Sequence, residues 1–580
     1  MLRTALLFFF CTLCHASTPS LQVLLTAPEV SLDPAVASDL SSLSITENIF
    51  EPLLRYQYLA RPLALQGNTA QALPQISDGG KTYLLRLKPG IFFTPDPAFQ
   101  GKPRELQAQD YVYSWQRLYD PALKSPWLFL LKGKLLGEQA LLDAAQQGKF
   151  DAKLTIPGLQ ALDRYTLQIR LQQPDPNFLY FLAMPASSAV AHEVAVAYPQ
   201  QLGNHPVGSG PYQVVEWQRS HRMVLQANVQ YRQEVSDFSA PLPPSSRAAQ
   251  AALQGKRLPR TQRIEIKIVE EAQAQVLGFF SGQFDYLEQV PPALSNMLLQ
   301  AGQLKPELAQ RGIVLSHFTP LQTYYMWMNM QDPVLGGYSK EKIALRRAIA
   351  LAYNRQEDIR LLEKGLALPA HSPIPPTAIG FDPTYRSPIP HDVKLANALL
   401  DKFGYQQRDP QGFRRQVDGS PLQLTMHTLT TADSRARDEV WRKTLQSIGI
   451  RLQFKADKKS EINKAARQGQ VQMFETNWIG DFPDGENFLQ LLYGPNSGGA
   501  NYAHFQLPAY DRLYEQARGL PDAAPRRALY RQMQDLIHAY NPWLPRIYPL
   551  SLDVQQPWLK NYVRHPVEFT NWRYLEVLPH

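Results

Sequence analysis

Residues 165–172 read Tyr165-Thr-Leu-Gln-Ile-Arg-Leu-Gln172, an unbroken alternation of apolar and polar side chains. A period of two predicts a β-strand that buries one face and exposes the other. Residues 83–87 and 264–268 also carry apolar side chains at every second position. The chain therefore contains several strands of a sheet with one face against a core.

Helical patterns lie between these strands. Apolar residues within 344–352 recur at the spacing i, i+4, i+7 and i+8, and Ser339 stands ahead of them as a helix N-cap. Residues 438–448 continue a second amphipathic pattern, which Gly449 ends. Strands and helices interleave, so the sequence predicts α/β domains.

Length and composition exclude several classes of protein. The chain has 580 residues, which suggests several domains, and 44% hydrophobic with 19% charged residues does not fit a disordered chain. The formal net charge is +8, but the basic residues are scattered and form no long run. No nucleic-acid partner is expected, because neither a basic stripe nor a recognition motif is present.

Residues 1–16 have the pattern of a secretory signal. Arg3 precedes an apolar run, and the small residue Ala16 is followed by polar residues. Cleavage after Ala16 would remove Cys11 and Cys14, the two cysteines of the chain. The large residue before Cys14 argues against lipid attachment there. We therefore expect an exported mature protein without cysteine, which excludes thiol catalysis and zinc–thiolate sites.

Motifs of enzymes and metal sites are incomplete. His192-Glu193 begins like a zinc-protease helix, but Val196 stands where the second histidine would be. Ser209 lies within residues 207–211, Val-Gly-Ser-Gly-Pro, which predicts a tight turn with positive φ at both glycines and not a nucleophile elbow. We expect no enzyme, no metal and no cofactor, although a Ser/His/Asp triad built from distant residues stays open on sequence grounds.

A set of six motifs in a fixed order resembles the periplasmic oligopeptide-binding proteins, the extracellular solute-binding receptors of ABC importers. The resemblance covers essentially the whole mature chain. Its motifs are Asp33-Pro34, Asn48–Leu54, Gln109–Arg117 with Asp120-Pro121, Pro206–Tyr212, Leu345–Ala352 and Asn477–Asp484.

The resemblance implies a two-lobed periplasmic-binding-protein fold of class α/β, with a hinge of two crossovers and an extra inserted domain. Lobe I would comprise 17–55, 203–320 and 541–580, the inserted domain 56–202, and lobe II 321–540. Such a protein is expected to be a monomer in the periplasm. It would capture a peptide or peptide-like solute between its lobes and deliver it to the transmembrane subunits of an ABC permease.

The motif Asn477–Asp484 provides the candidate ligand site. Burying a peptide ammonium is costly unless a carboxylate pairs with it, and an extended peptide satisfies its backbone by strand addition. In the resembling family the matching aspartate pairs with the ammonium, so Asp481 is the first candidate. The stretch before it completes the expected site: Asn477, Trp478, Ile479 and Gly480. Alternatively, Asp481 caps the next helix and Trp478 packs inside its lobe.

Aromatic residues elsewhere are further candidates. Tyr113 matches a family tyrosine whose hydroxyl reaches the peptide, but its spacing also fits a core-facing position. Tyr324, Tyr325 and Trp327 lie in a strand-like stretch that lines either the cleft or a core.

One departure from the family pattern concerns the ligand carboxylate. Family members selective for short peptides place cations shortly before the tryptophan motif, whereas Glu475 stands three residues before Trp478 here. Lys459 replaces an aromatic residue of the family, and Lys459 and Arg467 remain candidate cations. The ligand is therefore a peptide, a modified peptide or another bulky polar solute. A secreted α/β hydrolase of peptide-like substrates and a peptide-binding chaperone or sensor of the same fold remain alternatives.

Overall fold

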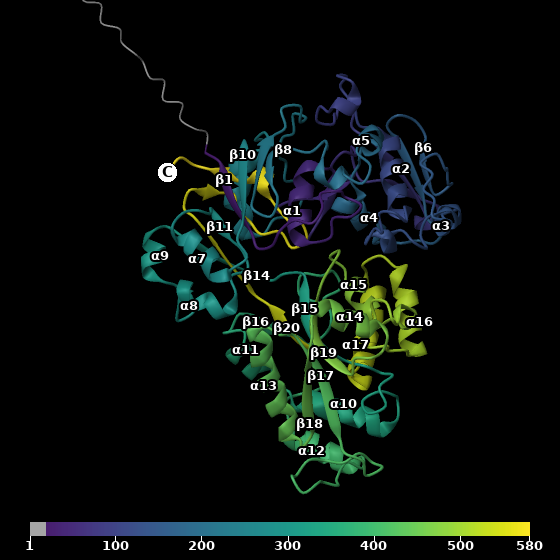
Figure 1. Cartoon of the computed structure of the whole chain (residues 1–580), viewed down its shortest axis with the longest axis vertical. Helices are drawn as coiled ribbons and strands as arrows, with labels where there is room; N and C mark the ends of the chain where they lie inside the picture. The colour runs from purple at the N-terminus through teal and green to yellow at the C-terminus, as the bar shows by residue number, and fades with distance from the viewer. Residues whose placement is uncertain (1–18) are drawn as a thin grey trace, which may run out of the picture.

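The computed structural model describes residues 19–580, so the predicted signal at 1–16 lies outside the described residues. The chain forms an upper part, with lobe I and the inserted domain side by side, and a lower part, lobe II (Figure 1). Among the described residues, no helix is both long and apolar enough to cross a membrane.

Lobe I is built on two small sheets. The first has the order β1-β10-β9-β8, and the second has the order β11-β21-β14. Its strands are β1 (Leu21–Leu25), β8 (Tyr212–Gln218), β9 (Arg222–Ala227), β10 (Arg263–Ile268), β11 (Tyr286–Leu287), β14 (Val314–Phe318) and β21 (Ser551–Gln555). Its helices are α1 (Leu40–Ile49), α6 (Arg247–Leu253), α7 (Ala272–Phe280), α8 (Ser295–Leu298) and α9 (Pro306–Gln310). The short pairs β12–β13 (Leu299–Gln300, Gln303–Leu304) and β22–β23 (Leu559–Lys560, Glu576–Val577) complete it.

The inserted domain carries the sheet β4-β5-β7-β6. The predicted strand at 165–172 is confirmed as β7, in which buried and more exposed residues alternate. Its elements are β2 (Leu54–Tyr56), β3 (Leu65–Gly67), β4 (Gln75–Ser77), β5 (Thr82–Arg86), β6 (Leu159–Ala161), β7 (Thr166–Arg170), α2 (Ala108–Gln116), α3 (Gln139–Gln146), α4 (Phe178–Phe181) and α5 (His192–Ala197). One hydrophobic core joins this domain to lobe I.

Lobe II is a six-stranded sheet, β16-β20-β15-β19-β17-β18, with helices around it. Its strands are β15 (Gln322–Met328), β16 (Ala367–Pro369), β17 (Gln423–Thr428), β18 (Arg451–Ala456), β19 (Met473–Ile479) and β20 (Trp543–Pro549). Its helices are α10 (Lys340–Ala352), α11 (Arg355–Leu361), α12 (Val393–Lys402), α13 (Ala432–Ser447), α14 (Lys459–Arg467), α15 (Glu486–Leu489), α16 (Pro508–Arg518) and α17 (Ala524–Tyr540). The expected helix after Ser339 is confirmed as α10, whose N-cap is the Ser339 side chain.

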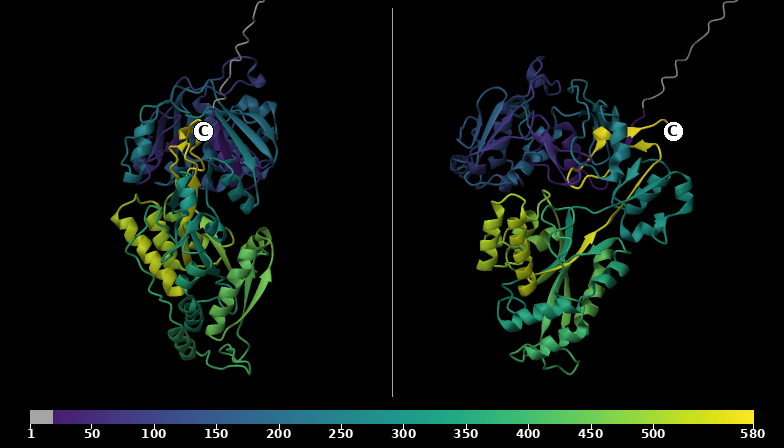
Figure 2. Two further views of the ribbon diagram at one scale, coloured as in Figure 1. Left: turned by 90° about the vertical axis from the view of Figure 1, so that its left-hand side faces the viewer. Right: turned by 180° about the vertical axis from the view of Figure 1, so that it is seen from behind.

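Two crossovers join the lobes, one between β14 and β15 and one between β20 and β21. They run side by side, because β14 and β21 pair in lobe I and β15 and β20 pair in lobe II (Figure 2). The second crossover lies near Leu550, whereas the expected boundary was residue 541, because β20 pairs in the lobe II sheet. We propose the division of the chain given above, except that lobe II ends near Leu550 and not before residue 541.

The glycine turn 207–211 packs against helix α1. Neither Gly208 nor Gly210 has a positive φ, so that expectation is wrong. A Cβ atom on Gly208 would instead lie 1.9 Å from the main-chain oxygen of Ile49. Glycine is needed here because two backbone segments approach closely.

Candidate functional site

The loop after β19 fixes Asp481 through one buried amide, that of Asn487 on α15. The Asn487 Nδ2 donates to the Asp481 carboxylate at 3.0 Å, and the Asp481 N–H donates to Asn487 Oδ1 at 3.1 Å. Trp478 Nε1 donates to the same oxygen at 2.8 Å. The Asn487 amide thus hydrogen-bonds both Trp478 and Asp481 and holds them in fixed positions relative to each other. Sequence reasoning missed Asn487, because nothing in its local pattern distinguishes it from a surface asparagine.

The Asp481 carboxylate lies deep in the molecule without a cation. Burial raises its pKa to about 6, and the hydrogen bond from Asn487 opposes that rise. Among residues 19–580, no lysine, arginine or histidine nitrogen comes within 4.0 Å of it. Charged groups this deep are normally paired. The geometry therefore suits a cationic group supplied from outside the chain.

An open strand edge leads to this acid. One edge of β19 pairs with β15 along its whole length, from Met473 to Ile479. The other edge pairs with β17 at Met473 and Phe474 alone. Residues 475–479 therefore have free backbone groups on one side within the described chain, the arrangement that accepts an added strand. Ile479 is 49% exposed, and a Cβ on Gly480 would collide with Leu321 in the first crossover.

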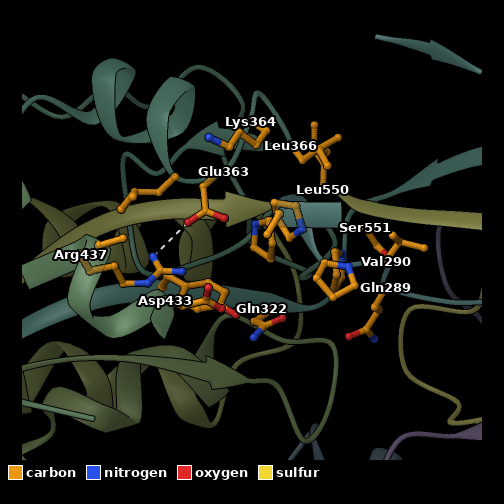
Figure 3. A pocket seen from close by; sticks show the side chains of 18 of the residues that line it. Gln289, Val290, Gln322, Glu363, Lys364, Leu366, Asp433, Arg437, Leu550 and Ser551 are labelled. Atoms are coloured by element: carbon orange, nitrogen blue, oxygen red, sulfur yellow. Dashed lines mark hydrogen bonds and ion pairs between the residues drawn. The ribbon is translucent and has the colours of Figure 1, made fainter. Parts of the chain in front are cut away.

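A small cavity adjoins this edge and shares Tyr324 and Arg437 with a larger cavity. The larger, of about 390 Å³, is lined by residues of both crossovers and by Arg437 of α13 (Figure 3). The smaller, of about 130 Å³, is lined by residues 475–477, by 426–429 at the end of β17, and by Lys459. The open edge of β19 therefore faces a space next to the hinge.

An ion-pair network lies beneath these cavities. Arg437 contacts Glu363 at 3.0 Å and Glu475 at 3.4 Å. Glu475 also accepts from Trp441 Nε1 at 2.8 Å and pairs with the fully buried Arg546. The sequence departs from the family pattern at Glu475. The negative charge of Glu475 is neutralised by Arg437 of α13 and by Arg546 of β20. Sequence reasoning missed Arg437, because its side chain reaches the cavities from a distant helix.

The other sequence candidates divide into two groups. Asn477, Tyr324 and Lys459 line a cavity, whereas Arg467 lines neither.

Three aromatic candidates lie elsewhere, and we do not retain them. Tyr325 and Trp327 are 3% and 1% exposed and belong to a core of lobe II, since they point to the opposite sheet face from Tyr324. Tyr113 is 7% exposed and packs on Phe150 and His192 within the inserted domain.

The upper part of the molecule closes over the Asp481 loop. Tyr180 of α4 stacks on Phe482 at 5.9 Å between ring centroids, and Asn177 donates to Glu486 at 3.3 Å. Val567 packs against the cores of both lobes. The site therefore lies at an interface between lobes that already touch.

Comparisons with known proteins agree on the fold. Residues 64–500 match the bacterial extracellular solute-binding proteins, family 5. The chain is 25% identical over 561 residues to the probable deoxycholate-binding periplasmic protein YgiS of Escherichia coli, covering 95% of this chain and 92% of that one. It is 26% identical over 532 residues to di/tripeptide-binding protein 4 of Pseudomonas aeruginosa, covering 90% and 89%.

Solved structures give the same architecture. The periplasmic binding protein DppA of Helicobacter pylori, in complex with the peptide STSA, has a TM-score of 0.72 at 22% identity, covering 96% of this chain and 98% of that one. The unliganded open form of the murein tripeptide-binding protein MppA has a TM-score of 0.71 at 22% identity, covering 97% and 98%. The names of these proteins include a bile acid and peptides, so the shared fold alone does not fix the ligand.

Proposed function

This chain belongs to family 5 of the bacterial extracellular solute-binding proteins, and from that membership we propose that it captures a peptide or peptide-like solute with a free amino group. The solute would lie between the lobes of a monomer in the periplasm and pass to the transmembrane subunits of an ABC importer. Relatives named as di/tripeptide-binding and oligopeptide-binding proteins support this proposal.

The unpaired Asp481 carboxylate at the end of an open strand edge carries the proposal. An α-ammonium group satisfies the carboxylate, and the peptide backbone that follows it pairs with residues 475–479 of β19. Tyr324 and the cavities beyond would receive side chains. A bile acid fits this arrangement less well, because its own carboxylate would meet Asp481.

We further propose that the protein is a receptor and not a hydrolase. Among the described residues, Ser497 and Ser387 lie beside histidines, His504 and His538. In both pairs the second ring nitrogen bonds a main-chain carbonyl at 2.8 Å, where a triad needs a carboxylate. Mass spectrometry of a tripeptide incubated with the protein should recover it intact. Release of smaller fragments in proportion to protein concentration would refute the receptor proposal.

Binding of an amine ligand should depend on pH in a defined direction. Because burial raises the pKa of Asp481 to about 6, the carboxylate is ionised above that pH and protonated below it. Affinity for a protonated amine is therefore constant near pH 7.5 and falls as pH drops through 6, by up to about tenfold per unit. Isothermal titration calorimetry at several pH values measures this dependence.

The matched control is Asp481→Asn, which should bind a ligand without a basic side chain more weakly and with a nearly flat pH dependence over the same range. His427 lines the smaller cavity, and burial and the charge of Lys455 lower its pKa below the ordinary value of histidine. Equal affinity of the wild-type protein at pH 7.5 and pH 5 would contradict the assignment of Asp481.

The chaperone or sensor alternative differs from a transport receptor in the fate of the bound solute. Uptake of the solute by cells with and without the permease separates delivery from simple binding. Mass spectrometry of the small molecule released by denaturing the purified protein identifies the solute class directly.

A further inference from the structure

Two carboxylates on the lobe I side of the cleft have no ion-pair partner. Glu47 lies on α1, and Glu568 lies on the segment 561–570, which runs along the lower edge of the upper part beneath α1 (Figure 1). Among residues 19–580, no cationic nitrogen comes within 4.0 Å of either carboxylate. Glu47 accepts a hydrogen bond from the Thr570 N–H at 3.0 Å.

These carboxylates are largely buried but partly accessible to solvent. Both residues keep part of their surface accessible, and the adjacent Val567 packs against the cores of both lobes. Burial raises the pKa of Glu47 to about 8 and that of Glu568 to about 7, and at Glu47 the charge of Glu568 adds to the rise. The two acids therefore lie close together where the lobes meet.

A buried hydroxyl beside them also lacks a partner. Tyr56 is 3% exposed, and its Oη has no hydrogen-bond partner among the described residues. Burial raises the pKa of this hydroxyl, and the charges of Glu47 and Glu568 raise it further. His565 Nε2 is unpartnered as well, and its ring centroid lies 5.3 Å from that of Tyr56. Buried polar groups are normally satisfied, so this concentration indicates a missing partner.

The nearby arginines direct their hydrogen bonds to other groups, although Arg573 Nη1 has no partner among the described residues. Arg55 pairs with Glu234, and Arg61 donates to three main-chain carbonyl oxygens. Arg573 donates to the main-chain oxygen of Glu47 and not to its carboxylate. All three lower the pKa of Glu568 without contacting its oxygens. The carboxylates are therefore partly accessible and have no ion-pair partner among the described residues.

An aromatic stack connects this place with Asp481. The Tyr56 ring stacks on Tyr180 at 6.3 Å, and Tyr180 stacks on Phe482 at 5.9 Å. Phe482 directly follows Asp481 in the chain. Two stacked ring pairs therefore lie between Asp481 and the two glutamates. One ammonium group cannot span this separation, but two cationic groups on one solute can.

We propose that Glu47, Glu568 and Tyr56 Oη form a second cation subsite, which binds a basic side chain of the solute whose α-ammonium is held by Asp481. The side chain would be a primary ammonium or a guanidinium, and the preferred solute a peptide with one basic residue. This inference rests on the proposed function and deepens it, because it names the substrate class.

Matched tripeptides test the inference on the intact mature protein. Three contain one lysine among alanines, at position 1, 2 or 3, and three contain norleucine at the same positions. Norleucine keeps most of the side chain and lacks the charge. Calorimetry should give at least one lysine peptide an affinity about tenfold or more above its norleucine counterpart. Glu568→Gln and Glu47→Gln should each reduce that ratio toward one.

The control variant is Glu439→Gln, which removes an acid that is 51% exposed on α13 and should keep the full ratio. If every norleucine peptide binds as tightly as its lysine counterpart, the second subsite is wrong while the proposed function stands. If no tripeptide binds, the proposed function fails and the inference fails with it. The ratio of lysine-peptide to norleucine-peptide affinity in the wild-type protein tests the second subsite even if a variant does not fold.

Discussion

Asp481→Asn is expected to weaken binding of a free-amine ligand by about thirty-fold or more. Removing one partner of a desolvated charge pair typically costs about 2–5 kcal/mol. The asparagine keeps the shape of the side chain and its contact with Asn487, which lies 3.0 Å from the carboxylate, so the loss reports the charge. Calorimetry with a tripeptide, or with whichever solute copurifies, measures the change.

Two controls separate charge from packing. An N-acetylated form of the same ligand should bind the wild-type protein weakly and the variant no worse. Trp478→Phe should cost less than Asp481→Asn, because it removes one neutral hydrogen bond to Asn487, worth about 1 kcal/mol. Unchanged affinity of Asp481→Asn for the free-amine ligand would show that the loop is only structural.

Arg546→Met is expected to lower the free energy of unfolding of lobe II by about 3–5 kcal/mol. Arg546 is fully buried and contacts Asp358 at 2.5 Å, and it also pairs with Glu475. Removing it leaves Asp358 buried without a cation and leaves Glu475 with Arg437 alone, the costly way to break such a network. Chemical denaturation followed by tryptophan fluorescence measures the loss.

The matched control is Arg442→Met on α13. Arg442 pairs with Glu439 at 3.2 Å, and both side chains are about half exposed, so water screens the pair and its loss should cost less than about 1 kcal/mol. If the two variants lose equal stability, the network around Glu475 does not hold the lobe together. Arg546→Met should also disturb Arg437 and hence the cavity wall.

Local patterns in the sequence were sufficient to predict individual strands and helices. The alternation at 165–172 becomes β7, because a strand places successive side chains on opposite faces. The helix after Ser339 forms because its cap and its apolar stripe are both local. Asp481 could be proposed as a site residue because the motif that carries it is contiguous in sequence.

The partners of these residues could not be predicted in this way. Tyr324 and Tyr325 look equivalent in sequence, and only the side of the sheet that lobe II covers with its core distinguishes them. The turn glycines were assigned a positive φ, although the close approach of α1 is what requires them.

The sequence by itself determined the α/β class, the family and the acid that ends the open strand. Only the tertiary structure decided which side chains meet: Asn487 against Asp481, Arg437 beside Glu475, and Glu568 near Glu47. Glu47 and Glu568 stand 521 residues apart in the chain. The physical reason is that electrostatics and hydrogen bonding depend on distance in space, which the packing of whole lobes sets and local sequence periodicity does not.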